Sequence, residues 1–435
     1  MRRFLRIIYN LLNPGMFAAL LVLAGRYRGF SALWPQAPAW VDATLVIAVC
    51  AWLVLIYRRL FNRAAGRDRR TGAAAIFSPG TRLFQTALLL LGLLFLAGIA
   101  WSADPEYGLH KATYFFIYVI TWSALIMHLE NRDVDILLKT MVAAALLLTA
   151  AAVAPLLPGI AAALAAGETV TWGRLSAIGG GPNVFSRFTS VGFLITFYYI
   201  LKSSSWPKQL LLCPVLIVLG AATYLSGSRG SFLGLAGALL VYMILRIIIR
   251  RRRLLVNVTV LVAVIMILVI LIFGLDVQDR YRPAWEAPQD QAGDRFYCAR
   301  RSLELGAASP WIGWGTGSFA YHVPEAEARY PHNIFLELYA ENGVLGLALL
   351  TLLLAGIAWV WLDALRLCPE NSPAEREQVY LFAALLVFSL LVAQVSGDTV
   401  DSRWIWFSGF LIANLCLRLK EGKAAVTVES ISDHN

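Results

Sequence analysis

Uninterrupted runs of apolar residues constrain the fold of this chain more than any other feature of its sequence. Two examples are LFQTALLLLGLLFLAGIAW at 83–101 and LLVNVTVLVAVIMILVILIFG at 254–274. Runs of roughly 17–21 residues have the length that spans the hydrocarbon core of a bilayer as an α-helix. Because a backbone in lipid must satisfy its own hydrogen bonds, each run is predicted to be a helix. Charged residues make up only 15% of the chain, whereas about a quarter is usual in soluble domains.

Counting these runs predicts an all-α integral membrane protein with about twelve transmembrane helices. The first run is the weakest, because Asn13, Pro14 and Gly15 interrupt it. No cleavable signal peptide is expected, because MRRFLRIIYNLLNPG lacks a small-residue cleavage site after a clean apolar core. The predicted spans are 11–25, 41–57, 83–101, 112–128, 134–154, 184–201, 208–225, 230–248, 254–274, 343–362, 379–396 and 404–418.

Lysine and arginine in the short loops predict which face of the membrane is cytoplasmic. The loops 57–70, 201–208 and 246–253 fall on one face, together with MRRFLR at the start and RLK at 418–420. The positive-inside rule makes that face cytoplasmic and puts both termini there. We attribute the net charge of +10 to this topology and to contact with anionic lipid headgroups. No nucleic-acid partner is predicted, because the sequence contains no basic–aromatic surface module.

The opposite, outer face carries one large polar insert, residues 275–342, between the ninth and tenth predicted spans. It is the only polar segment long enough to form a small subdomain. Its arginines break the positive-inside trend, which long segments are able to do because they translocate whatever their charge. Cys298 is the only cysteine predicted at this face, so we expect no disulfide framework. The other predicted outer segments are 101–111, 155–183, 226–230 and 396–404.

No metal ion or cofactor is predicted from the sequence. His322, His332, Glu325 and Glu327 are the only conceivable set of metal ligands, and no helix-spaced histidine pair or CxxC supports them. GGGPN at 179–183 is no phosphate-binding P-loop, because it lacks the Lys-Ser/Thr that holds nucleotide phosphates and magnesium.

His332 and Asn333 stand side by side in YPHNIFLELYAENGVLG, at the mouth of an apolar run. Either residue could cap a helix that begins near 332, since Asn in particular accepts hydrogen bonds from the first free backbone N–H groups. The alternative is chemical, because histidine is the side chain best suited to take a proton near neutral pH. At the aqueous end of a membrane helix, such a base could meet a polar acceptor and a lipid-borne donor.

Arginines near the outer face suggest an anionic ligand. Arg229 lies in a turn between two apolar runs, and Arg187 lies at or just inside a span. Ionised groups at membrane depth are costly, and they usually pair or line a polar cavity. Both side chains could simply snorkel to the interface. They could instead hold an anionic head group, because arginine pairs with phosphate through two hydrogen bonds. Arg295, Arg300 and Arg301 of the insert could complete such a cluster.

These segments resemble the O-antigen ligase/polymerase superfamily. PHNIFLELYAENGVLG is similar to its His-Asn-x-x-Leu…Glu-x-Gly-x-x-Gly signature, GWGTGSF (313–319) to its Gly-x-Gly-x-Gly-x-Phe segment, and SGSRGSFLGL to its Ser-Arg-Gly segment. GPN at 181–183 is a weaker similarity. In order and spacing the resemblance covers roughly residues 175–350, while the N-terminal third is similar only in hydropathy.

The resemblance implies a metal-independent, inverting glycosyltransferase at the periplasmic face of the bacterial inner membrane. The donor would be a glycan on undecaprenyl diphosphate, and the acceptor, in the ligase branch, a sugar hydroxyl of lipid A–core. The family's catalytic histidine corresponds to His332 and its Ser-Arg-Gly arginine to Arg229. Its loop arginine corresponds best to Arg295, although the tryptophan that many members carry shortly afterwards is absent and Phe and Tyr follow instead. Arg300 or Arg301 could hold that role.

The expected contributions of the site residues follow from this chemistry. His332 would act as base, and Arg229 and Arg295 would hold the diphosphate, whose departing charge preorganised arginines can stabilise as Mg²⁺ does elsewhere. Five further residues are expected to bind substrate: Arg187, Asn333, Arg300, Arg301 and Glu337. Glu337 and Glu341, four residues apart on one helix face, could support the site or simply be solvated.

Three hypotheses compete: a ligase, a polymerase or protein O-oligosaccharyltransferase of the same superfamily, and a lipid-linked glycan transporter. A ligase is favoured over a polymerase, because polymerases often carry more than one large outer loop. A protein O-oligosaccharyltransferase is less favoured, because few residues follow the last span. A lipid-linked glycan transporter is the alternative from another class, but the polar residues gather at one face rather than at the membrane midplane. The predicted division is 1–274 for spans one to nine, 275–342 for the periplasmic loop with the catalytic motif, 343–418 for three further spans and 419–435 for a cytoplasmic tail.

Overall fold

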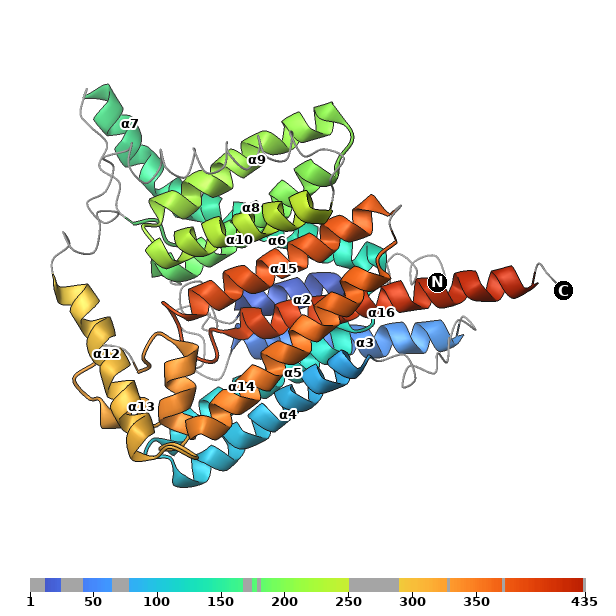
Figure 1. Cartoon of the computed structure of the whole chain (residues 1–435). Coiled ribbons are helices and arrows are strands. Elements are labelled where there is room, and N and C mark those ends of the chain that lie inside the picture. Colours follow the sequence, from blue (N-terminus) through green and yellow to red (C-terminus); the bar gives the residue numbers. More distant parts are fainter. Residues whose placement is uncertain are drawn as a thin grey trace.

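The computed structural model describes residues 12–24, 42–64, 78–166, 174–177, 181–249, 289–326, 329–369 and 372–432. Within these ranges the chain forms helices joined by turns and loops, with no β-sheet (Figure 1). The predicted all-α architecture is therefore confirmed.

Nine helices of the described ranges are long and apolar enough to cross a membrane. They coincide with nine of the predicted spans, so the prediction of an integral membrane protein is confirmed. α2 (Pro14–Ala24) is apolar but shorter, and α16 (Arg403–Ser432) carries several charged residues towards its end. The predicted span 254–274 lies outside the described residues, and the count of twelve stays a prediction. The nine are α3 (Ala43–Ala64), α4 (Pro79–Gly98), α5 (Pro105–Ile126), α6 (Asn131–Val153), α8 (Gly181–Lys202), α9 (Trp206–Leu225), α10 (Arg229–Ile249), α14 (Ile334–Leu367) and α15 (Pro373–Ala393).

Shorter elements connect these helices. Two single 3₁₀ turns, η3 (Ile99–Trp101) and η4 (Ala154–Leu156), follow α4 and α6, and α7 (Leu157–Ala165) extends beyond η4. Two helices belong to the predicted outer insert, α12 (Gln289–Ala308) and α13 (Phe319–His322). Of the predicted domain limits, 274 lies outside the described residues, and 342 and 418 lie within α14 and α16 (Arg403–Ser432); the division remains a prediction.

The bundle has a buried centre and an apolar rim. α8, α15 and the first half of α16 bury most of their side chains, whereas α3 and α9 expose large apolar residues such as Leu53 and Leu211. An exposed leucine on a spanning helix faces lipid, which is as apolar as the side chain itself. α4 runs along α14 in close contact: a Cβ on Gly356 would lie 2.7 Å from the backbone nitrogen of Phe84. Small residues at such crossings allow two membrane helices to approach closely.

The segments predicted for the outer face meet at one end of the bundle. The backbone N–H of Thr316, in the insert, donates to the carbonyl of Gly98 at the end of α4 (3.3 Å). At the other end Arg246 donates to the carbonyl of Leu201 (3.5 Å), so two of the basic segments also lie together. Figure 1 shows α12, α13 and the α15–α16 connection on one side and the C-terminus on the other.

Two helix boundaries differ from the prediction. Residues 101–111 were expected to be a loop, but α5 already begins at Pro105, because the carboxylate of Asp104 caps it by accepting from the Tyr107 N–H (3.0 Å). Lys111 therefore lies inside a membrane helix. α14 is longer than the predicted span and contains a kink at Gly343, whose φ of 63° and ψ of −158° are not helical.

Candidate active site

Asn333 and His332 stand at the start of α14 in different conformations. The Oδ1 of Asn333 accepts from the backbone N–H groups of Phe335 (2.9 Å) and Leu336 (3.1 Å), so Asn333 is the helix cap. His332 directly precedes it with a φ of 60°, the only positive φ of a non-glycine residue in the described part of the chain. Such a backbone costs free energy and tends to persist where the surrounding structure fixes a functional side chain. The His332 ring lies 4.9 Å from that of Tyr330.

The connection between α15 and α16, residues 394–402, joins three helices at the outer end; we call it the α15–α16 loop. Its Gln394 accepts from the Asn333 side chain (3.0 Å), and its Ser396 carbonyl accepts from the Arg187 guanidinium (2.8 Å). Its Asp398 accepts from the hydroxyl of Tyr107 on α5 (2.8 Å). One loop therefore links the start of α14, the start of α8 and the start of α5.

The same loop contacts the start of α10, where Arg229 is the first helical residue. A Cβ on the next residue, Gly230, would lie 2.5 Å from the side chain of Val395. Arg229 itself is half-buried. Arg174 ties this turn to the start of α8, because it donates to the Ser226 carbonyl (3.0 Å) and to Asn183 of the GPN segment (3.2 Å).

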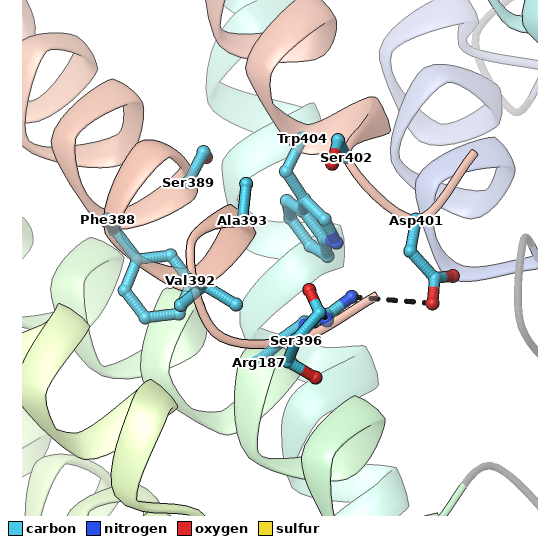
Figure 2. A pocket seen from close by; sticks show the side chains of 9 residues that line it. All are labelled: Arg187, Phe388, Ser389, Val392, Ala393, Ser396, Asp401, Ser402 and Trp404. Carbon is cyan, nitrogen blue, oxygen red and sulfur yellow. Dashed lines mark hydrogen bonds and ion pairs between the residues drawn. The ribbon is translucent and has the colours of Figure 1, made fainter. Parts of the chain in front are cut away.

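Arg187 is buried beside a small pocket under the α15–α16 loop (Figure 2). Its guanidinium is 3.9 Å from the Asp401 carboxylate, which also pairs with Arg403 (3.3 Å). The side chain is 4% exposed, so it does not snorkel to an interface. Its predicted contact with substrate stays a prediction. The pocket is lined by Arg187, Phe388, Ser389, Val392, Ala393, Ser396, Asp401, Ser402 and Trp404.

A buried lysine on α5, Lys111, contacts two buried glutamates that lie one to two turns into α14. The Nζ of Lys111 is 2.5 Å from Glu337 and 2.8 Å from Glu341. All three side chains are at most 2% exposed, so the interpretation of the two glutamates as a solvated helix face is wrong. Buried charges are tolerated when they pair and are hydrogen-bonded. Contact between Glu337 and substrate stays a prediction.

The glycine-rich segment 313–319 packs between α14 and the α4–α5 turn. The backbone N–H of Gly315 donates to the Glu341 carbonyl (2.8 Å), and that of Gly317 donates to the Glu341 carboxylate (2.8 Å). Gly315 has a φ of 95°, and a Cβ there would lie 2.5 Å from the Cα of Ser102. Only glycine fits that position, which explains why the segment contains glycines rather than other small residues.

The predicted loop arginines lie on α12, at the edge of the molecule (Figure 1). Arg295 and Arg300 are exposed, and Arg301 is partly exposed. Arg300 and Arg301 both pair with Glu304, and their hydrogen bonds lower the pKa of that carboxyl below its ordinary value. α12 is held to α14 by an apolar cluster that includes Cys298, Leu305 and Ala340. A role in diphosphate binding stays a prediction for all three arginines.

Five residues of this region were missed by sequence reasoning: Tyr107, Lys111, Asp398, Asp401 and Arg403. Lys111 could have been noticed in the sequence, because it is a charged residue next to an apolar run and such a residue needs a partner if it enters the membrane. Asp398 and Asp401 could not have been noticed in this way, because acidic residues are common in loops. Among the described residues, no three His, Cys, Asp or Glu side chains gather as metal ligands would. The absence of a metal stays a prediction.

Comparisons with known proteins bear on the segment that contains these motifs. No curated protein matches the chain. Residues 214–351 match the family model described as O-Antigen ligase, which covers the turn before Arg229, the glycine-rich segment and the start of α14. This family consists of membrane glycosyltransferase-like enzymes, and the match does not distinguish a ligase from a polymerase. It agrees with the motifs and with the membrane-spanning helices: residues 214–351 of this multi-pass membrane protein are similar to the O-antigen ligase family.

Proposed function

We propose that this protein is an O-antigen ligase of the bacterial inner membrane. It transfers a glycan from undecaprenyl diphosphate to a sugar hydroxyl of lipid A–core at the periplasmic face. The observation that carries this proposal is the α15–α16 loop, which ties together the start of α14, Arg187 and the start of α10. His332 and two arginines, Arg187 and Arg229, come from distant parts of the chain and lie near this loop, at the end of the bundle where the predicted outer segments meet.

The proposed reaction is a direct displacement. The acceptor oxygen forms a bond to the anomeric carbon as the bond from that carbon to the diphosphate oxygen breaks, which inverts the configuration. His332 takes the proton of the acceptor hydroxyl, and such a base is worth about 10²–10⁴-fold in rate. Arg229 and Arg295 hold the diphosphate and stabilise the charge that develops on its leaving oxygen. Arginine is suited to this task because its planar fork matches phosphate oxygens.

A polymerase of the same superfamily is the second candidate. Ligase is preferred on one observation from the sequence, because a single large outer insert dominates and polymerases often carry more than one. A transporter remains as a candidate from another class. It is disfavoured because the buried charged residues around the start of α14 and the α15–α16 loop lie at one end of the bundle, rather than at the membrane midplane.

The experiment that separates these candidates is the gel profile of lipopolysaccharide from a strain lacking this gene. A ligase predicts loss of the whole O-antigen ladder with intact core, restored by the wild-type gene and not by His332→Ala. A band with a single repeat unit would show a polymerase instead. An unchanged ladder would overturn the assignment, and a purified protein that transfers no lipid-linked glycan to rough lipopolysaccharide would favour the transporter.

A further inference from the structure

The first part of α14 is not held by the rest of that helix. In a continuous helix the N–H groups of Val344 and Leu345 would donate to the carbonyls four residues earlier, at Ala340 and Glu341. Here they donate to Pro310 (2.7 Å) and Trp311 (3.2 Å). The carbonyls of Ala340 and Glu341 accept from Trp314 (3.1 Å) and Gly315 (2.8 Å) instead. Backbone inserted into the hydrogen-bond ladder is a known cause of a sharp kink.

This break isolates residues 334–342, which we call the N-terminal segment of α14. The segment is the helical stretch that follows His332 and is capped by Asn333. Because Gly343 is not helical, the membrane-embedded part of α14 cannot fix the direction of the segment through its backbone alone. Its orientation depends on contacts with other elements: the backbone N–H groups of Trp314 and Gly315, which bind the carbonyls of Ala340 and Glu341, and the side chains that contact the segment.

Lys111 makes the charged side-chain contacts of the N-terminal segment of α14. Its Nζ binds Glu337 (2.5 Å) and both carboxylate oxygens of Glu341 (2.8 and 2.9 Å), one turn further along the same face. Two attachment points one turn apart fix both the position and the rotation of a short helix. Lys111 also lies 5.0 Å from the centre of the Tyr107 ring, and the Arg329 guanidinium lies 5.4 Å from the same centre. Tyr107 in turn donates to Asp398 of the α15–α16 loop.

We propose that Lys111 is a positioning residue for His332 and acts through the N-terminal segment of α14. The inference rests on the proposed function, since it assumes that His332 serves the transfer reaction. Stability alone does not account for a lysine here, because replacing a buried ion pair by apolar groups is often neutral or stabilising. A fixed orientation does account for it. A displacement of about 1 Å at a reacting group can cost about 10²-fold in rate, so the loss of this contact should appear in kcat.

The test uses the purified full-length protein in nanodiscs. Lys111→Met leaves two buried carboxylates without their counter-charge, so it tends to unfold the protein. The triple variant Lys111→Met, Glu337→Gln, Glu341→Gln removes all three charges and keeps similar volumes. Lys139→Met is the matched control, because Lys139 forms an ion pair of similar length with Asp135 (2.6 Å) on the exposed surface of α6.

Two measurements are made on each variant. The first is transfer of a polyisoprenyl-diphosphate-linked glycan to rough lipopolysaccharide, with kcat and the KM for donor determined separately. We expect the triple variant to lose at least tenfold in kcat with donor KM changed less than threefold, and the control to match the wild type. The second is hydrogen–deuterium exchange, which should become faster in residues 334–342 and remain unchanged in 346–367.

The outcomes separate the inference from the function on which it rests. A triple variant with kcat within threefold of the wild type, or with unchanged exchange in 334–342, overturns the positioning role of Lys111. A wild-type protein without transfer activity overturns the proposed function, and the exchange measurement still decides whether Lys111 holds the segment.

Discussion

Substitution of His332 separates its chemistry from its backbone conformation. The residue holds a φ of 60°, which is unfavourable for any side chain with a Cβ. An alanine there keeps the penalty of about 1–2 kcal/mol, whereas glycine avoids it and loses about 0.5–1 kcal/mol through its greater freedom in the unfolded chain. His332→Gly should therefore be more stable than His332→Ala by roughly 0.5–1 kcal/mol, the difference between these two terms. Asparagine, which tolerates this region, should resemble the wild type in stability.

All three variants should nevertheless be inactive as transferases. A base contributes about 10²–10⁴-fold, which corresponds to about 3–5 kcal/mol of transition-state stabilisation. The assay is transfer of lipid-linked glycan by purified protein, with thermal unfolding of the same preparations measured in parallel. A variant that keeps more than about a tenth of wild-type turnover would show that His332 is not the base. A His332→Gly protein that unfolds before His332→Ala would show that the backbone at this position is not strained.

Three further predictions concern the arginines, the kink and metals. Arg229→Lys keeps the charge but loses the bidentate contact with phosphate, so transfer activity should fall. Full activity of Arg229→Lys, together with unchanged carrier affinity of Arg229→Ala, would show that Arg229 only lies at the membrane interface. Gly343→Ala should destabilise the protein by about 1–3 kcal/mol, because its Cβ would lie 2.5 Å from the carbonyl carbon of Trp311. Gly422→Ala is the control, because a Cβ there meets no atom within 4 Å. Equal thermal unfolding temperatures of the two variants would contradict this prediction. Transfer in vitro should survive EDTA without stimulation by Mg²⁺ or Mn²⁺, because the arginines supply the positive charge; a rate that collapses in EDTA and returns with Mg²⁺ would send the search back to the carboxylates of the insert.

Much of the architecture could be predicted because lipid imposes a simple pattern. Apolar runs of spanning length can only be helices, so the described spans agree with the sequence within a few residues, apart from earlier starts such as that of α14. The cap at the start of α14 was also predictable, since Asn before an apolar run satisfies free N–H groups at a helix end. Sequence alone left open whether His332 or Asn333 was the cap, and the hydrogen bonds to Phe335 and Leu336 decide for Asn333.

The contacts that orient the candidate site could not be predicted, because their partners are far apart in the chain. Lys111 and Glu337 are 226 residues apart, and no local pattern links a lysine at the start of one helix to a glutamate on another. The kink at Gly343 had a weak local signal, since Asn-Gly interrupts an apolar helix. Its cause is the backbone of residues 310–315, and inserted backbone leaves no trace in hydrophobic periodicity.

The α15–α16 loop has a consequence for the order in which the protein matures. Translation delivers Tyr107 to the membrane 291 residues before its partner Asp398, and Arg187 209 residues before the carbonyl of Ser396. At about 5–20 residues per second, the first delay lasts roughly 15–60 s. Tyr107 and Arg187 are therefore made long before the groups that hold them, whereas Asn333 precedes its partner Gln394 by only 61 residues. The contacts around the α15–α16 loop can consequently form only after α15 and the start of α16 have been made, and we expect a chain arrested before that point to lack transfer activity.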